Sequence, residues 1–286
     1  MTDHLISAVP VPFTPDGSLD DAAFTSVLSA LDPYVDAVLV AGTTGEFPAL
    51  DDDERLSAFR SAAAVLGAQR VIAHVGHASS HQVLRLAAAT RELGVDRVAL
   101  LSPYYLPTDD TGTVEFFAAL SREHADGELY GYFFPERTGA VVPVSVVADV
   151  LALPGMAGMK LSGGASAQLQ EHLAVRRPGQ AVWSGDDATF GRVLAAGGTG
   201  VVSGVSSLFP ATFGALRTAL VGGDSAEADR LQGVVEHLVA LVGPSIARLK
   251  TGLALRTGSP WAVRMAQPAV PADLREAIAT AVSDHS

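Results

Sequence analysis

The chain has 286 residues, 48% of them apolar, which is enough to bury a large core. Its formal net charge of −12 argues against a surface for nucleic acid or anionic membranes, and the lack of cysteine excludes disulfides and thiolate chemistry. Residues 1–11 lack a signal-peptide pattern, and no apolar run reaches ~18 residues, so we expect a cytoplasmic protein without a membrane partner.

Short runs rich in Val, Ile and Leu recur along the chain, each followed by a turn and a helical pattern. They predict strands at Leu5–Val9, Ala37–Ala41, Val71–Val75, Arg97–Leu101, Leu129–Phe134, Met156–Lys160, Ala181–Ser184 and Gly200–Ser203. Most of these runs are apolar throughout, as is typical of parallel strands buried on both faces. Eight strand–helix units predict an α/β fold, a (β/α)8 TIM barrel over residues 1–222 that contains the active site.

After about Val221 the strand signals stop. Ala226–Val242, Ile246–Arg256 and Ala272–Val282 predict three further helices. We therefore expect residues 223–286 to form a helical appendix packed on the barrel. Lys250 lies within one of these helical patterns and is expected at the solvated surface. Earlier in the chain, the acidic run 51–54 is typical of a capped helix start.

Reactive side chains gather where the predicted strands end, which is the active face of such a barrel. Lys160, one of only two lysines, closes the sixth strand, and Tyr132 lies in the fifth. An amine desolvated in an apolar barrel is more often neutral and can condense with a ketone to give an iminium. A tyrosine linked to other hydroxyls can move the protons. Thr43 and Thr44, after the second strand, offer hydroxyl and amide groups to a small carboxylate.

Five ordered motifs across about residues 5–210 resemble the dihydrodipicolinate synthase and N-acetylneuraminate lyase family. They are GTTGE at 42–46, PYY at 103–105, Y-x-x-P-x-RTG at 132–139, GMK at 158–160 and SGDD at 184–187. The resemblance implies a class I aldolase or lyase that forms a Schiff base with pyruvate on a (β/α)8 barrel. It implies no cofactor and no metal.

The resemblance also implies catalytic roles for four residues. Lys160 is the Schiff-base lysine and Tyr132 the general acid and base. Thr43 is the hydroxyl of the proton relay. Tyr105 resembles the relay tyrosine that reaches into a neighbouring subunit's site, so we expect a homo-oligomer, either a dimer or the family's usual tetramer.

Four residues are expected to bind substrate. Thr44 resembles the residue at the pyruvate carboxylate, and Gly42 belongs to the same loop. Val202 resembles the residue whose carbonyl lies near the reaction centre. Arg137 resembles the arginine that, in dihydrodipicolinate synthases, receives the carboxylate of aspartate semialdehyde.

Departures from the family pattern leave the second substrate open. Leu106 stands where the synthases usually have Asn, and Phe133 and Phe134 replace Asn and a small aliphatic residue. The reaction closest to the motifs is a 4-hydroxy-tetrahydrodipicolinate synthase-like condensation of pyruvate with aspartate semialdehyde. The alternative is an aldolase or dehydratase for another 2-keto acid, of the 2-keto-3-deoxy sugar acid or N-acetylneuraminate type. A further alternative is a non-catalytic relative that binds a keto acid.

Two other clusters have simpler interpretations. His74, His77 and His81 are three and four residues apart, a spacing that could hold a metal, but His74 is expected within a strand. Asp186 and Asp187 are expected to cap the helix that follows them.

Overall fold

The computed structural model describes residues 2–285, so the first residue of the predicted barrel and the last of the predicted appendix lie outside that part. Eight parallel strands pair in chain order and close into a barrel, which confirms the predicted fold. The strands are β1 Leu5–Ala8, β2 Ala37–Val40, β3 Val71–His74, β4 Arg97–Leu101, β5 Glu128–Phe133, β6 Met156–Leu161, β7 Ala181–Ser184 and β8 Gly200–Ser203. Each predicted strand agrees with the observed one to within one residue at either end.

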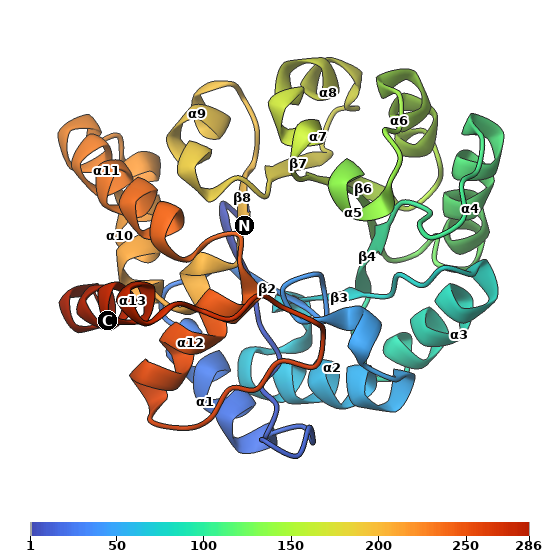
Figure 1. Cartoon of the computed structure of the whole chain (residues 1–286). Coiled ribbons are helices and arrows are strands. Elements are labelled where there is room, and N and C mark those ends of the chain that lie inside the picture. The colour runs from blue at the N-terminus through green and yellow to red at the C-terminus, as the bar shows by residue number, and fades with distance from the viewer. Residues whose placement is uncertain (1, 286) are drawn as a thin grey trace.

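Helices surround the strands as an outer ring (Figure 1). The α-helices up to the end of the barrel are α1 Asp21–Leu31, α2 Asp52–Leu66, α3 Ser80–Arg91, α4 Asp110–Glu123, α5 Pro135–Thr138, α6 Val144–Leu151, α7 Gly164–Ala167, α8 Leu169–Val175, α9 Phe190–Ala195 and α10 Pro210–Gly222. Short 3₁₀ turns are η1 Phe47–Ala49, η2 Ala68–Arg70, η3 Asp187–Thr189 and η4 Val205–Ser207. The acidic run before α2 forms a capping box between Asp51 and Glu54, as predicted.

The three helices predicted after the barrel are confirmed as α11 Ser225–Val242, α12 Ile246–Thr257 and α13 Ala272–His285. α11 packs against α10, and α13 packs against α12 (Figure 1). The division of the chain at residue 222 stays a prediction. Within residues 2–285 no single helix is long and apolar enough to cross a membrane, and α11 and α12 meet that criterion only jointly, across a bend of 108°.

A one-residue bulge in β6 decides which way Lys160 points. Leu129 of β5 pairs with Met156, and the next residue, Tyr130, pairs with Gly158, so that Ala157 is the extra residue of β6. Met156 packs outward among the helices, and regular alternation would turn Lys160 outward as well. Because the extra residue inverts the alternation, Lys160 becomes the register partner of Tyr132 and faces the barrel interior.

Gly158 allows β6 to make this bulge. A Cβ atom at Gly158 would lie 2.2 Å from the carbonyl oxygen of Ala181 in β7, well inside contact distance. The residue also has φ +155°, a conformation that L side chains rarely adopt. The glycine two residues before Lys160 is therefore a requirement of close backbone approach.

The prediction that Lys250 is solvated is wrong. Its side chain is 1% exposed, and Nζ lies 2.6 Å from Oε1 of Glu46, which is itself fully buried. Burial lowers the pKa of Lys250 to about 8, against the opposing effect of Glu46. The other carboxylate oxygen of Glu46 accepts hydrogen bonds from the backbone N–H groups of Arg264 at 3.0 Å and Met265 at 2.7 Å. Glu46 thus ties the loop after β2 to the tail of the chain.

Replacing Gly158 tests the bulge. We expect Gly158→Ala to lower the free energy of unfolding by about 1–3 kcal/mol, because the new methyl group overlaps backbone atoms of β7. Denaturant unfolding measures the change. Gly233→Ala in α11 is the control, since a Cβ atom there meets nothing within 4 Å and alanine favours helix. Equal stability of Gly158→Ala and wild type would contradict the proposed need for glycine.

Candidate functional site

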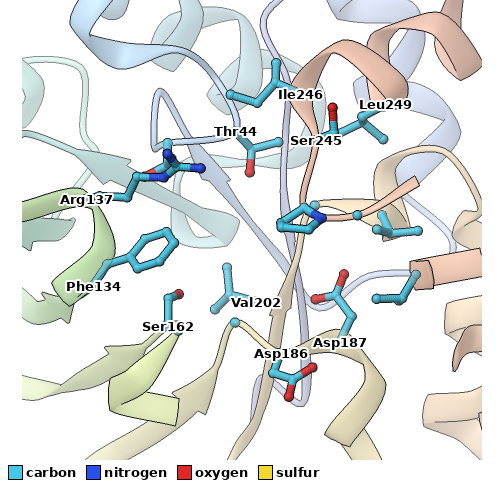
Figure 2. A pocket seen from close by; sticks show the side chains of 18 of the residues that line it. Thr44, Phe134, Arg137, Ser162, Asp186, Asp187, Val202, Ser245, Ile246 and Leu249 are labelled. Atoms are coloured by element: carbon cyan, nitrogen blue, oxygen red, sulfur yellow. The ribbon is translucent and has the colours of Figure 1, made fainter. Parts of the chain in front are cut away.

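A cavity of about 520 Å³ opens where the strands end. Strand ends and their loops form one side of it, and the segment around the start of α12 forms the other (Figure 2). Among the predicted site residues, the cavity is lined by Thr43, Thr44, Tyr132, Arg137, Lys160 and Val202. Gly42 and Tyr105 do not line it.

Lys160, Tyr132 and Thr43 lie next to one another in the cavity. Lys160 is 8% exposed, and its Nζ atom lies 4.1 Å from the centroid of the Tyr132 ring. The hydroxyl of Tyr132 lies 3.2 Å from that of Thr43, within hydrogen-bond distance. Gly185 packs closely on β6, because a Cβ atom there would lie 2.3 Å from Oγ of Ser162 and 3.3 Å from Cε of Lys160. The arrangement places an amine against the ring of a tyrosine whose hydroxyl group is linked to that of Thr43.

The loop that presents Thr43 and Thr44 is tightly turned. It is bracketed by Ala41 and Glu46, which have positive φ angles of 52° and 56° although neither is glycine. Within the turn, the amide of residue 45 donates to the carbonyl of residue 42 at 3.1 Å. Gly42 thus shapes the loop through its backbone and does not line the cavity, and its role in binding substrate stays a prediction.

The histidines considered as metal ligands contact an arginine instead. His74 is completely buried; its Nδ1 lies 3.0 Å from the carbonyl oxygen of Ala41, and burial followed by the charge of Arg55 holds its pKa well below the usual range. Arg55, also buried, places a guanidinium nitrogen 3.0 Å from Nε2 of His77. A cation between two imidazoles disfavours a second cation there. No group of three or more metal-binding side chains gathers anywhere in residues 2–285.

The two phenylalanines that depart from the family pattern point in opposite directions. Phe133 packs outward against Phe117, with ring centroids 5.7 Å apart. Phe134 turns into the cavity, and the Cζ atom of Arg137 lies 5.5 Å from the centroid of its ring (Figure 2). Among the described residues Arg137 makes no ion pair. The neighbouring carboxylate of Glu136 accepts a hydrogen bond from the backbone N–H of residue 164 at 2.8 Å. The charge of Arg137 is therefore available to a ligand.

Tyr105 lies outside the cavity of its own chain. It is 85% exposed, and its φ angle of 77° is one that a bulky residue rarely adopts. Leu106 beside it is 71% exposed. The placement agrees with a residue that serves a neighbouring molecule, a role that stays a prediction.

The expectation that Asp186 and Asp187 cap a helix is wrong. Neither side chain accepts a hydrogen bond from the turn that begins there. Asp187 is buried at the cavity wall, where one carboxyl oxygen accepts from the hydroxyl of Ser203 at 2.8 Å and the other has no partner among the described residues. Burial raises the pKa of Asp187 to about 7, and the hydrogen bond from Ser203 opposes that rise.

The far wall of the cavity escaped prediction from the sequence. It is formed by residues of α11, the α11–α12 connection and α12, namely Val239, Val242, Gly243, Pro244, Ser245, Ile246 and Leu249. The spacing of apolar residues in a helix predicts which of them are buried, but it does not predict which cavity they line.

The raised pKa of Asp187 predicts a dependence of stability on pH. Between its ordinary value of 3.8 and about 7, the folded protein holds a proton that the unfolded chain has lost. The bound proton on Asp187 therefore stabilises the folded protein at low pH, and this stabilisation is lost as the pH rises to about 7. We expect Asp187→Asn to gain roughly 2–4 kcal/mol relative to wild type between pH 4 and pH 7. Urea unfolding at a series of pH values measures it, with Asp186→Asn as the exposed control; parallel curves for wild type and Asp187→Asn would refute the assignment.

Comparisons with known proteins agree with the geometry. A model of the dihydrodipicolinate synthetase family matches residues 1–282. The 4-hydroxy-tetrahydrodipicolinate synthase of Methylococcus capsulatus is 31% identical over 240 residues, which cover 83% of this chain and 82% of that protein.

Solved structures give the same result for the fold. The dihydrodipicolinate synthase of Bacillus anthracis has a TM-score of 0.90 at 25% identity, covering 99% of this chain and 98% of that one. The 2-keto-3-deoxygluconate aldolase of Sulfolobus solfataricus has a TM-score of 0.87 at 21% identity, covering 98% and 95%, which is a likeness of fold alone. From the family match over nearly its whole length, the chain belongs to the dihydrodipicolinate synthetase family of lyases.

Proposed function

We propose that the protein is a class I aldolase or synthase in which Lys160 forms a Schiff base with pyruvate. The observation that carries the proposal is the contact of Lys160 with the ring of Tyr132, whose hydroxyl group lies within hydrogen-bond distance of Thr43 in the same cavity. The amine attacks the keto carbon of pyruvate, and loss of water leaves an iminium. Removal of a proton from the adjacent methyl group gives an enamine, whose terminal carbon attacks the carbonyl carbon of an aldehyde. The aldehyde oxygen takes up a proton, and hydrolysis frees the lysine.

The remaining residues have roles that follow from their positions. The Tyr132 hydroxyl, linked to Thr43, moves protons to and from the intermediates. Thr44 and the amides of its loop hold the pyruvate carboxylate. Val202 is buried and lines the cavity, and we assign its carbonyl the place beside the reacting carbon that the family resemblance implies. Gly42 acts through the shape of the loop rather than by touching the substrate.

Aspartate semialdehyde is the aldehyde that we propose first. Its carboxylate suits the guanidinium of Arg137 at the cavity, which makes no ion pair among the described residues. The curated relative from Methylococcus capsulatus, named as a 4-hydroxy-tetrahydrodipicolinate synthase, supports the same choice. The second candidate is cleavage of a 2-keto-3-deoxy sugar acid. The hydroxyl groups of Ser162 and Ser245, which line the cavity, could serve the sugar chain.

Trapping the intermediate tests the covalent mechanism. Reduction with borohydride in the presence of pyruvate should add about 72 Da to the intact protein, which is one pyruvate less one water plus two hydrogens. Lys160→Ala should remain unmodified. Mass spectrometry measures both, and assays with aspartate semialdehyde and with 2-keto-3-deoxygluconate then separate the two candidates. Absence of the adduct from wild type, or its persistence in Lys160→Ala, would reject the proposal; an adduct without turnover of any aldehyde would favour the non-catalytic keto-acid binder.

Mixing two inactive variants tests whether Tyr105 serves a neighbouring subunit. Lys160→Ala and Tyr105→Phe should each lose most activity alone. Subunits unfolded and refolded together at equal amounts should regain about a quarter of the wild-type activity, because half of random dimers are hybrid and each hybrid has one complete site. Each variant refolded alone is the control. No recovery in a mixture shown to contain hybrids would place Tyr105 outside the partner's site.

A further inference from the structure

We propose that Phe134 is a positioning residue that fixes the distance between the reacting centre and the cation that binds the aldehyde. In this role it selects aldehyde acids of one chain length. The inference rests on the proposed Schiff-base function and deepens it.

Phe134 contacts the reaction machinery on one side. It comes directly after β5, two residues beyond Tyr132, so that both rings face the barrel interior. The ring centroids of Phe134 and Tyr132 lie 6.1 Å apart with an interplanar angle of 35°. Pro135 follows at once, and the backbone of Phe134 has φ −144° and ψ 83°. The contact between the two rings places Phe134 beside the proposed acid and base.

On its other side, Phe134 supports the guanidinium of Arg137. The short helix α5 sets this spacing, because the backbone N–H of Arg137 donates to the carbonyl of Phe134 at 2.9 Å. The guanidinium carbon then lies 5.5 Å from the ring centroid, a cation–π distance. Glu136, between them in sequence, accepts a hydrogen bond from the backbone N–H of Gly164, the first residue of α7, and forms no ion pair with Arg137 among the described residues. Figure 2 shows Phe134 and Arg137 extending from the same segment toward the cavity.

The ring thus separates a cation from a reactive centre by a surface that cannot form hydrogen bonds. An aldehyde acid that presents a methylene group to the ring fits this arrangement, with its carboxylate at Arg137 and its carbonyl carbon at the enamine. A hydroxyl group on the carbon that faces the ring would lose water on binding and find no partner on the ring itself. An acceptor of the wrong length cannot reach both ends.

A series of aldehydes tests the proposal. Succinic and glutaric semialdehyde differ by one methylene group, and butanal and pentanal are their uncharged counterparts; aspartate semialdehyde adds the amino group. The measured quantity is kcat/KM for each aldehyde with pyruvate. We expect wild type to prefer carboxylated over uncharged aldehydes and one chain length over the other. Phe134→Leu should reduce both preferences by about 2- to 5-fold, the effect of losing one cation–π contact.

Matched variants separate positioning from damage to the fold. Phe133→Leu makes the same change one residue earlier, on the outward face, and should leave both preferences unchanged. Arg137→Met should abolish the preference for a carboxylate. If Phe134 acts through Arg137, adding Phe134→Leu to Arg137→Met should change the carboxylate preference no further.

Other outcomes would contradict the positioning role or the function beneath it. If wild type forms the pyruvate adduct but Phe134→Leu keeps both preferences, the positioning role is wrong and the proposed function stands. The positioning role is also wrong if the effects of Phe134→Leu and Arg137→Met are additive, or if wild type accepts none of the carboxylated aldehydes. If wild type forms no pyruvate adduct, the proposed function fails and this inference fails with it.

Discussion

The site depends on the bulge in β6. The backbone of Gly158 lies so close to β7 that no side chain fits between them, and the extra residue Ala157 inverts the alternation of the strand. Lys160 therefore faces Tyr132 across neighbouring strands, where both side chains point into the barrel. If β6 had no bulge and Met156 still faced outward, the amine of Lys160 would be buried among the helices instead. The chemistry proposed for the cavity thus depends on a backbone irregularity three residues before the lysine.

Two buried carboxylates near this centre, Glu46 and Asp187, have different surroundings. Glu46 is buried in a left-handed conformation, with the ammonium of Lys250 at one carboxylate oxygen and two backbone amides of the tail at the other. A buried ion pair of this kind contributes little net stability but makes the loss of either partner costly. It joins the loop that carries Thr43 and Thr44 to α12, whose first turn forms the opposite wall of the cavity. Asp187, by contrast, keeps one oxygen without a partner among the described residues at the cavity wall. Glu46 thus holds the loop after β2 against the tail of the chain, whereas Asp187 keeps one oxygen free of partners in the described residues at the cavity wall.

The barrel could be predicted from the sequence because each strand is a short apolar run followed by a turn, and parallel closure follows from the number of such units. The reactive residues could be predicted because they stand in ordered motifs at strand ends. The burial of Lys250 could not, because its ammonium pairs with Glu46 and donates to the carbonyl of Ala262, two residues that the helical pattern does not connect with it. The opposite directions of Phe133 and Phe134 follow from the period of a strand once the inward position of Tyr132 is known. The wall contributed by α11 and α12 depends on how distant segments pack, for which the sequence has no local signal.

The scarcity of lysine has a practical consequence. Both lysine side chains are buried, one in the cavity and one in the ion pair with Glu46. An endoproteinase that cleaves only after lysine would divide the unfolded chain at just two bonds, after residues 160 and 250. Any reagent that blocks the amine in the cavity abolishes the first cut and leaves the second. The length of the amino-terminal fragment, 160 residues or 250, therefore reports whether the cavity was occupied by an amine-reactive compound before unfolding.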